Sequence, residues 1–367
     1  RQLRNPGARY RCLGDADLGT VMNRVSLFFK RPFVTELREQ PLPEPSEDQV
    51  LIATRLSGIS AGTEMLVFKD QFPRHLTVDA SIKSLSGRFQ YPLRYGYSCV
   101  GRVAAVGVRI DPAWIGRRVF ALHPHESHFT IVPDALVPLP DNVPDEDAVF
   151  LPSMETAVNL MMDGRPVIGE RVMVWGLGVI GLLTTGLLAL SPLDRLVGVD
   201  PLPLRRETAA ALGADGVYSD TDEDFTAGVT SFFSQADGDA KADLIFELSG
   251  NPAALDSALT WAGYTSRIVI GSWYGTRAAT IDLGGAYHRD RIRLISSQVS
   301  SIDPTYAARW TTKRRMQVAL RMLAILRPGR LISHRFDLHQ AQKAYELIAD
   351  RPQAVLQVVM AYPTHET

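Results

Sequence analysis

Apolar residues follow one pattern in the first part of the chain. Over residues 24–150, short apolar runs alternate with Pro and Gly, which is typical of strands joined by tight turns. The clearest runs are residues 25–29, 49–54, 101–106, 118–122 and 128–132. Many short strands at close spacing predict a compact barrel or sandwich-like β domain.

From residue 147 onward, apolar runs alternate with helix-like segments. The predicted strands are residues 172–175, 196–199, 243–247 and 267–270. The predicted helices are residues 153–162, 181–190, 203–212, 253–261, 313–326 and 340–349. This βαβ rhythm predicts a parallel, doubly wound sheet. A closing strand at residues 354–360 is expected to return to the first domain.

Composition narrows the class of protein. The chain has 367 residues, of which 46% are hydrophobic, so two domains with substantial cores are possible. A net charge of −1 gives no electrostatic reason to expect nucleic acid or an anionic membrane as a partner. No apolar stretch approaches the ~20 residues of a membrane span. With only Cys12 and Cys99, a disulfide framework is excluded and a reducing, cytoplasmic location is expected.

The turn after the predicted strand at residues 172–175 matches G-x-G-x-x-G. It reads Gly176, Leu177, Gly178, Val179, Ile180 and Gly181, and Asp200 ends the next predicted strand. A dinucleotide site requires this order of strand, glycine turn, helix, strand and acid. Gly176 would permit the tight turn, Gly178 would let the backbone approach a pyrophosphate, and Gly181 would let the helix pack close to the sheet. An ordinary turn with three glycines explains the flanking segments less well.

Asp200 also bears on the form of the cofactor. Its carboxylate can accept hydrogen bonds from both adenosine ribose hydroxyls and would repel a 2′-phosphate, which favours NAD. Arg205 and Arg206 follow closely and could attract a phosphate, so NADP stays possible. Alternatively, Asp200 caps the helix that begins near Pro203.

Several segments resemble motifs of the medium-chain dehydrogenase/reductase superfamily over residues 24–362. Residues 58–64 resemble G-[IV]-C-x-[ST]-D, residues 96–103 resemble G-H-E-x-x-G-x-V, and residues 116–119 resemble G-D-R-V. Thr156 and Ala157 match a T-A pair before the glycine turn. The resemblance implies an α/β protein with a GroES-like β-rich catalytic domain and a Rossmann domain.

The resemblance also implies domain limits and cofactor contacts. We expect an N-terminal extension (1–23), a GroES-like domain (24–160), a Rossmann domain (161–300) and a return to the catalytic domain (301–367). Further cofactor contacts are expected at Thr156, Arg205, Ser249, Gly271 and Ser272, since ligands lie at the carboxyl ends of strands in such sheets. Trp273 and Tyr274 would line the substrate pocket or a subunit contact.

The chain departs from the zinc-dependent members of this superfamily. They hold the catalytic metal with a Cys, a His and a Cys or Asp, whereas the matching positions here are Ser60, Tyr97 and about Pro152. These side chains do not provide the thiolate, imidazole or carboxylate that Zn²⁺ prefers. The four-cysteine structural zinc lobe is absent as well. The resemblance therefore implies a member without zinc.

A group of histidines occupies the place of that lobe. His123, His125 and His128 with Glu126 could hold a metal, and on a strand His123 and His125 would point the same way. The favoured interpretation is a short loop and strand with surface or hydrogen-bonded histidines. A role for one of them in the substrate pocket is the intermediate alternative.

Without a metal, side chains must stabilise the oxyanion and exchange its proton. The matching positions nominate Tyr97, Ser60, Thr63 (a proton-relay position) and Glu64 as catalytic residues. Alternatively, Tyr97 lies in the barrel core, while Ser60 and Thr63 cap a helix with Glu64 in its first turn. Glu155 either faces the nicotinamide or pairs with an arginine.

The resulting hypothesis is a zinc-independent, NAD(P)-dependent oxidoreductase that interconverts an alcohol and a carbonyl. The alternatives are a zinc-free C=C reductase of the enoyl or quinone type and a non-catalytic NAD(P)-binding relative. The expected partners are a small-molecule substrate and a second copy in a homodimer, without nucleic acid or membrane.

Overall fold

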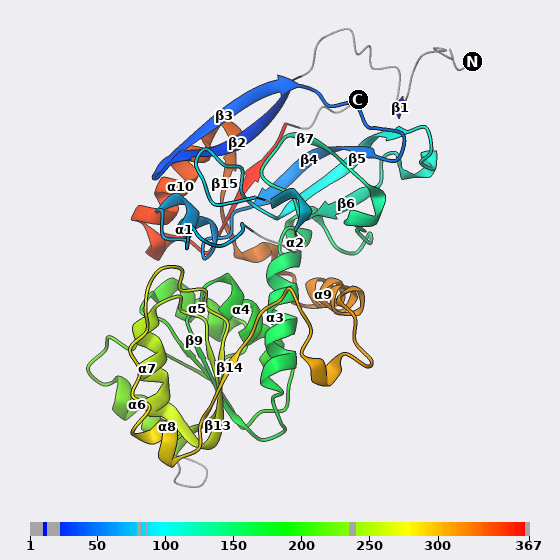
Figure 1. Ribbon diagram of the computed structural model, residues 1–367. Coiled ribbons are helices and arrows are strands. Elements are labelled where there is room, and N and C mark those ends of the chain that lie inside the picture. The colour runs from blue at the N-terminus through cyan, green and yellow to red at the C-terminus, as the bar shows by residue number, and fades with distance from the viewer. Residues whose placement is uncertain (1–9, 13–22, 79–81, 86, 235–239, 364–367) are drawn as a thin grey trace. The chain divides into compact units, whose positions relative to one another are not determined.

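The chain folds into two compact units. The computed structural model describes residues 10–12, 23–78, 82–85, 87–234 and 240–363. Unit 1 comprises Arg1–Pro152, Ile332–Asp350 and Gln357–Thr367, and unit 2 comprises Ser153–Leu331 and Arg351–Leu356 (Figure 1). Among the described residues, no helix is long and apolar enough to cross a membrane.

A mostly antiparallel sheet forms the body of unit 1. Its strand order is β15-β16-β4-β5-β6-β8, and β1 pairs with β5 while β7 pairs with β4. The bounds are β1 (Tyr10–Cys12), β4 (Val50–Gly58), β5 (Cys99–Gly107), β6 (Arg118–Ala121), β7 (His128–Ile131), β8 (Leu136–Pro138), β15 (Ile332–Asp337) and β16 (Gln357–Ala361). Apolar residues from β4, β5, β6 and β7 form one buried cluster.

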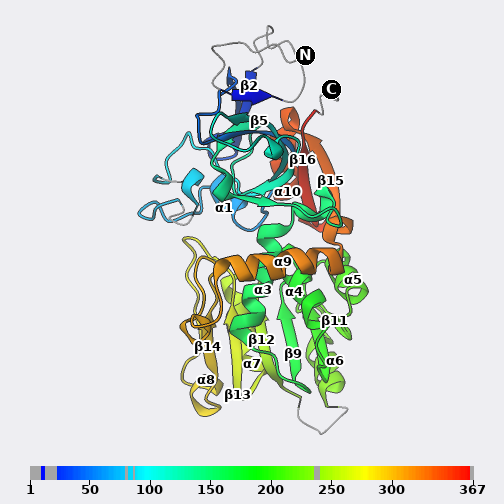
Figure 2. The ribbon, with the colours of Figure 1, turned by 90° about the vertical axis from the view of Figure 1, so that its right-hand side faces the viewer.

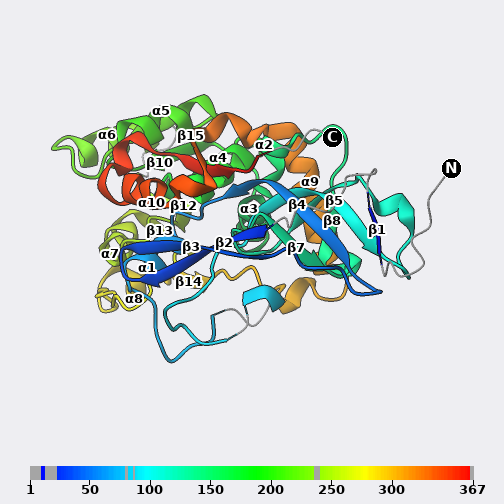
Figure 3. The same ribbon diagram turned by 90° about the horizontal axis from the view of Figure 1, so that it is seen from above.

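A separate antiparallel ribbon and short helices complete unit 1. The ribbon consists of β2 (Asn23–Arg31) and β3 (Val34–Pro41) (Figure 3). The helices are α1 (Glu64–Phe68), α2 (Asp145–Ala148) and α10 (Ala341–Asp350), with 3₁₀ turns η1 (Lys83–Leu85), η2 (Pro112–Trp114), η3 (Pro133–Ala135) and η6 (Leu338–Gln340). Tyr345 of α10 packs on Phe29 of β2 and Phe68 of α1, with ring centroids 5.1 and 5.4 Å away.

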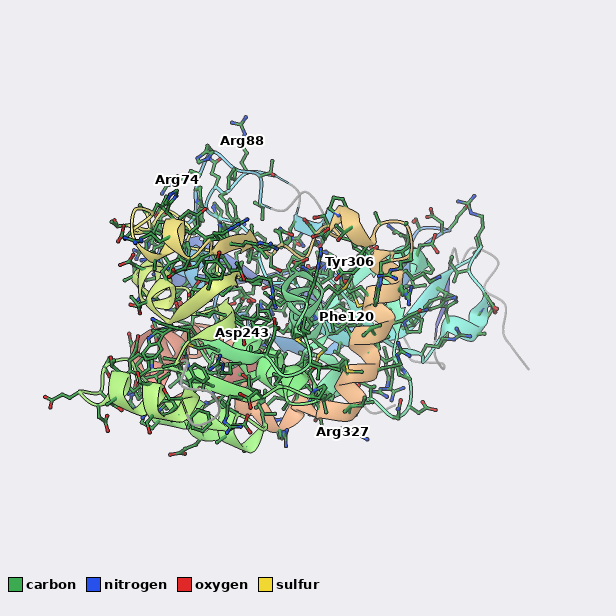
Figure 4. The ribbon with its side chains drawn as sticks, turned by 90° about the horizontal axis from the view of Figure 1, so that it is seen from below. Arg74, Arg88, Phe120, Asp243, Tyr306 and Arg327 are labelled. Atoms are coloured by element: carbon green, nitrogen blue, oxygen red, sulfur yellow. The ribbon has the colours of Figure 1, made fainter. Side chains whose placement is uncertain are left out.

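The segment between α1 and β5 has a small aromatic core of its own. Phe72 stacks on Phe89 with centroids 4.2 Å apart, and Phe89 is followed by Tyr95 at 6.1 Å. Both phenylalanines are buried, whereas the labelled side chains of Arg74 and Arg88 extend outward (Figure 4). This core anchors the stretch of chain that leads to Tyr97.

Unit 2 is built on a parallel sheet. In the part of the chain that the structure describes, its strand order is β11-β10-β9-β12-β13-β14. The bounds are β9 (Arg171–Trp175), β10 (Arg195–Val199), β11 (Gly216–Tyr218), β12 (Ala242–Glu247), β13 (Ala262–Ile270) and β14 (Arg293–Ser296). This 3-2-1-4-5-6 order reverses direction between β9 and β12, and ligands bind at the carboxyl edge beside such a reversal.

Helices cover both faces of this sheet (Figures 1 and 2). They are α3 (Leu151–Gly164), α4 (Val179–Leu188), α5 (Pro203–Ala211), α6 (Phe225–Phe233), α7 (Pro252–Trp261), α8 (Ala286–Arg289) and α9 (Thr312–Leu326), with 3₁₀ turns η4 (Pro304–Tyr306), η5 (Pro328–Leu331) and η7 (Pro352–Ala354). Ile245 of β12 belongs to the core shared with α6 and α7. Its neighbours Leu244 and Phe246 face Gly164 of α3 on the other side, as alternation along a strand requires.

The C-terminal return is shorter than residues 301–367. Helix α9 stays in unit 2, because it packs on α4, where Leu326 lies 3.0 Å from the position of a Cβ on Gly186. The return to unit 1 starts at Ile332. Strand β16 then pairs antiparallel with β4, with Val359 opposite Gly58.

Some elements lacked a clear sequence signal. Helix α6 reads FTAGVTSFF, a composition that favours strands, yet its spacing of four buries Val229 and Phe233 on one face. Strands β3, β8, β11, β14 and β15 were not predicted. In the expected N-terminal extension, β1 pairs with β5, and residues 1–9 and 13–22 lie outside the described residues.

Substitution of Gly101 should destabilise the β4–β5 pair. A Cβ at Gly101 would lie 2.4 Å from the carbonyl oxygen of Ala53. We expect Gly101→Ala to lower the free energy of unfolding by about 1–3 kcal/mol, the usual cost of overpacking, in urea titrations followed by circular dichroism. Gly62→Ala is the control, because a Cβ there meets nothing within 4 Å. Equal losses in the two variants would contradict this packing argument.

Candidate active site

Two of the three glycines in the turn between β9 and α4 are required by the chain itself. Gly176 has a φ of +94°, and a Cβ there would lie 2.3 Å from the backbone nitrogen of Ser249. A Cβ at Gly181 would lie 1.9 Å from the carbonyl oxygen of Gly176. The sharp turn and the close approach of α4 therefore exclude side chains at both positions.

Gly178 is different. Its φ of −64° and ψ of −177° are open to any residue, and a Cβ there would meet nothing within 4 Å. It is the N-cap of α4, and with Val179 and Ile180 it is half-buried, whereas Leu177 is buried. The chain's own packing does not explain a glycine here, and the first N–H groups of α4 are left for an external acceptor.

Asp200 connects the end of β10 to this turn. Its side chain is 3% exposed, and its Oδ2 accepts a hydrogen bond of 2.9 Å from the backbone N–H of Leu177. Oδ1 accepts from the N–H of Leu202, also at 2.9 Å. The N-cap of α5 is Leu202, so Asp200 does not cap that helix. Arg205 approaches Oδ2 at 3.4 Å.

The next strand ends lie beside the glycine turn. Glu247 of β12 is fully buried, and its Oε1 accepts a hydrogen bond of 2.9 Å from the N–H of Ser249. Ser272 Oγ accepts from the N–H of Gly250 at 2.8 Å, and the N–H of Gly271 donates to Glu247 O. Ser249, Gly271 and Ser272 thus share one sheet edge with Gly176.

Tyr274 also contacts this edge. Its hydroxyl donates to Glu247 Oε2 at 2.5 Å, and burial, followed by the hydrogen bond to Glu247, raises the pKa of the phenol. Trp273 remains 38% exposed. Tyr274 is therefore part of the scaffold around Glu247.

Glu155 of α3 pairs with an arginine, the second of its two predicted alternatives. Its Oε1 lies 3.1 Å from Nε of Arg315 on α9, which is 1% exposed and also donates to Asn159 and to the carbonyl of Ser301. Burial raises the pKa of Glu155, and Arg315 opposes that shift. Thr156 is half-buried next to it, and its contact with a cofactor remains a prediction.

In unit 1, three hydroxyl groups meet. Tyr97 Oη donates to Ser60 Oγ at 2.5 Å and lies 3.3 Å from Thr63 Oγ1. All three residues are half-buried, so the group is supported by the protein yet within reach of a ligand. Thr63 is the N-cap of α1 but makes no side-chain capping bond, which argues against the capping alternative.

Glu64 lies beneath this group. It is fully buried, and its Oε1 accepts a hydrogen bond of 2.8 Å from the backbone N–H of Ser60. Oε2 lies 2.9 Å from His125 Nε2 and accepts from the hydroxyl of Tyr345. Because no part of Glu64 is accessible, it does not meet substrate directly, contrary to its nomination as a catalytic group.

The histidines lie on a short connection and a strand and are hydrogen-bonded, as the favoured interpretation predicted. Residues 122–127 form a connection between β6 and β7, and His123 and His125 reach different carboxylates. His123 Nε2 lies 2.9 Å from Glu126 Oε2, and burial lowers the pKa of its imidazole. Burial also raises the pKa of Glu126, but hydrogen bonds from His123 and Ser26 outweigh that effect and lower it overall. His128 is half-buried.

The residues at the expected zinc position do not fit the metal. Tyr97 and Ser60 present hydroxyls that are hydrogen-bonded to each other, and the third matching position, about Pro152, has no ligand side chain, whereas Zn²⁺ binds thiolate, imidazole and carboxylate. Among the described residues, no group of three or more His, Cys, Asp or Glu side chains is arranged to hold a metal ion.

Sequence reasoning missed several participants in these networks. Arg315, Tyr345 and Tyr362 reach their partners from segments more than 150 residues away. Arg315 and Tyr345 read locally as ordinary helix residues, and Tyr362 directly follows the last strand. A single sequence does not indicate which arginine or tyrosine side chains will be buried in the folded protein.

Comparisons with known proteins show which families this chain resembles. The family model described as zinc-binding dehydrogenase matches residues 179–312, from the start of α4 to the start of α9. The starvation-sensing protein RspB of Escherichia coli K12 is 21% identical over 92% of this chain and 99% of its own length. The sorbitol dehydrogenase of Bacillus subtilis 168 is 24% identical over 60% of this chain and 66% of its own.

A solved structure shares the fold over nearly the whole chain. The crystal structure of the alcohol dehydrogenase RspB from Escherichia coli CFT073, complexed with NADH, has a TM-score of 0.74 at 19% identity and covers 92% of this chain and 99% of its own. The family-model match over residues 179–312, the near full-length relative and the common fold agree with the resemblance to the medium-chain dehydrogenase/reductase superfamily.

Proposed function

We propose that this protein is a zinc-independent, NAD-dependent oxidoreductase that interconverts an alcohol and a carbonyl compound. In this proposal unit 2 binds the dinucleotide at its glycine turn, and Tyr97 and Ser60 of unit 1 handle the substrate oxygen. The observation that carries the proposal is the open space beside Gly178 at the start of α4.

A pyrophosphate explains Gly178. Neither the backbone angles nor the packing of the chain requires glycine at this position. A dinucleotide phosphate approaching the N–H groups of α4 does require it, and the positive end of the helix dipole favours the phosphate charge. The RspB structure, which was solved with NADH, supports the same class of cofactor.

Asp200 supports NAD rather than NADP. Its carboxylate is held next to the glycine turn by Leu177 and Leu202, and Oδ1, which accepts from Leu202, has capacity for a further hydrogen bond. Ribose hydroxyls can supply that bond, whereas a 2′-phosphate would be repelled. Arg205 already faces Asp200, so its charge is partly compensated.

Tyr97 is the proposed acid and base. The nicotinamide of the bound cofactor supplies or accepts a hydride at the substrate carbon. Tyr97 Oη–H donates a hydrogen bond to the substrate oxygen and stabilises the charge that develops there. When an alcohol forms, the Oη proton moves to that oxygen, and a proton taken up from solvent water is relayed through the hydroxyl of Ser60 or Thr63 back to Oη.

Zinc has no part in this proposal. Tyr97, Ser60 and Thr63 form a cluster of hydroxyl groups. This cluster contains no thiolate or imidazole that could hold a Lewis acid at the substrate oxygen. The family name describes other members, and the donor set of this chain departs from what that name implies.

Gly178→Val should weaken cofactor binding strongly without harming the fold. The added side chain enters the space assigned to the pyrophosphate, so we expect NADH affinity to fall about 100-fold in isothermal titration calorimetry. The free energy of unfolding should stay within about 1 kcal/mol, the range for an N-cap change. Gly181→Ala is the contrasting variant, because its Cβ would clash inside the chain and should lower stability. Unchanged NADH affinity in Gly178→Val would refute the dinucleotide site.

Tyr97→Phe should lower turnover and leave cofactor binding intact. The change removes one hydroxyl and no ring contact, and loss of a proton donor typically costs about 10²–10⁴-fold in rate. The measurements are kcat with the best alcohol from a polyol and secondary-alcohol panel that includes sorbitol, and the Kd of NADH. Turnover equal to that of the parent protein would remove Tyr97 from the mechanism.

Purified protein should carry no stoichiometric zinc. Elemental analysis by mass spectrometry after dialysis should find well under one zinc ion per chain, and activity should survive treatment with a chelator. One tightly bound zinc per chain, lost together with activity, would overturn the argument from the donor set.

A further inference from the structure

We propose that the buried pair Glu64–His125 is a positioning device that holds Ser60 and Tyr97 in hydroxyl contact. This inference rests on the proposed function, because it concerns the geometry of the same hydroxyl group. It assigns to Glu64 and His125 a role that involves no contact with substrate.

Glu64 makes two hydrogen bonds to the backbone of Ser60. Its carboxylate Oε1 accepts from the N–H of Ser60 at 2.8 Å, and its own N–H donates to the carbonyl oxygen of Ser60 at 2.8 Å. Ser60 lies in the turn between β4 and α1, where no strand partner fixes it. The two contacts therefore orient the residue that carries the Oγ facing Tyr97.

His125 supports the backbone next to Tyr97, the second residue of the Ser60–Tyr97 contact. A Cβ at Gly96 would lie 2.6 Å from Cδ2 and 2.7 Å from Nε2 of His125, so the ring packs directly on the backbone before Tyr97. Gly96 has a φ of +109°, which suits glycine and no other residue. Since His125 Nε2 is 2.9 Å from Glu64 Oε2, one hydrogen bond joins the supports of Ser60 and Tyr97.

The remaining hydrogen bonds fix both side chains. His125 Nδ1 lies 2.7 Å from Ser57 Oγ, which lies 2.9 Å from the hydroxyl of Tyr362. The consistent assignment has Tyr362 donating to Ser57, Ser57 donating to Nδ1, and Nε2–H donating to Glu64. Tyr345 adds a third donor to the Glu64 carboxylate.

Burying a carboxylate at this position costs free energy of folding, so its hydrogen bonds need a specific role. Glu64 and His125 are both fully buried, and two apolar residues of similar volume are often at least as stable as a buried pair. Apolar side chains could not bind the N–H of Ser60. The specific contribution of the pair is therefore the orientation of Ser60 relative to Tyr97.

A double-mutant cycle tests this role. Glu64→Gln keeps the size of the side chain but replaces one acceptor oxygen with an NH₂ donor. The amide cannot accept all three hydrogen bonds from Ser60, His125 and Tyr345, so the orientation of Ser60 should change. We expect about a tenfold loss of kcat with the Kd of NADH unchanged within about twofold. In the Tyr97→Phe background the same change should cost less than about twofold, because the hydroxyl contact is already gone.

The second buried Glu–His pair of unit 1 provides the matched control. Glu126 is also fully buried, and its side chain bonds His123, Ser26 and Arg94 rather than Ser60. Glu126→Gln should lower stability and leave kcat near that of the parent. If Glu64→Gln does not fold, Tyr345→Phe removes one donor to Glu64 and should show a smaller loss with the same coupling to Tyr97.

The outcomes separate the two proposals. A large effect of Tyr97→Phe combined with equal effects of Glu64→Gln in both backgrounds would overturn the positioning role and leave the function standing. No effect of Tyr97→Phe would overturn the proposed chemistry itself. A loss of kcat in Glu126→Gln as large as that in Glu64→Gln would show that only general stability is being measured.

Discussion

A carboxylate that leaves water must be surrounded by hydrogen-bond donors, and in this chain the donors are repeatedly backbone N–H groups of functional loops. Asp200 holds Leu177 in the glycine turn, Glu247 holds Ser249, and Glu64 holds Ser60. Each carboxylate is nearly or fully buried. The same constraint thus orders loops with candidate site residues in each of the two units.

These carboxylates fix loops that the strand hydrogen bonds do not reach. The parallel sheet of unit 2 brings the ends of β9, β10, β12 and β13 to one edge, but the loops beyond that edge have no ladder to hold them. A carboxylate at a strand end adds a rigid contact to the next loop. In the glycine turn, side chains are also sterically excluded at Gly176 and Gly181. Of its three glycines, only Gly178 has room for a side chain within the protein.

In unit 1, hydroxyl side chains stand at two positions that the superfamily resemblance matches to metal ligands. The position matching a cysteine ligand holds Ser60 and the one matching a histidine holds Tyr97, and the two side chains now bond each other. Imidazoles are still present nearby, but His123 and His125 bond to buried carboxylates instead of converging on one point. The change of donor atoms, rather than the loss of the fold, is what shifts the expected chemistry to hydroxyl groups.

The amino-acid sequence by itself determined the parts of this protein that depend on neighbours along the chain. Apolar periodicity predicted the parallel sheet with helices such as α4, α5 and α7, and the spacing of glycines predicted the sharp turn at Gly176. The superfamily resemblance was confirmed by the comparisons. Local signals suffice there because turn geometry and amphipathic spacing are properties of short segments.

Only the tertiary structure decided which polar side chains meet. It placed α9 in unit 2, gave Glu155 its partner Arg315, and buried Glu64 between His125 and Tyr345. The composition of α6 favoured a strand, and packing of Val229 and Phe233 made it a helix. The partners of a buried charge come from segments far apart in the chain, so the burial that makes their contact strong arises only when the fold is complete.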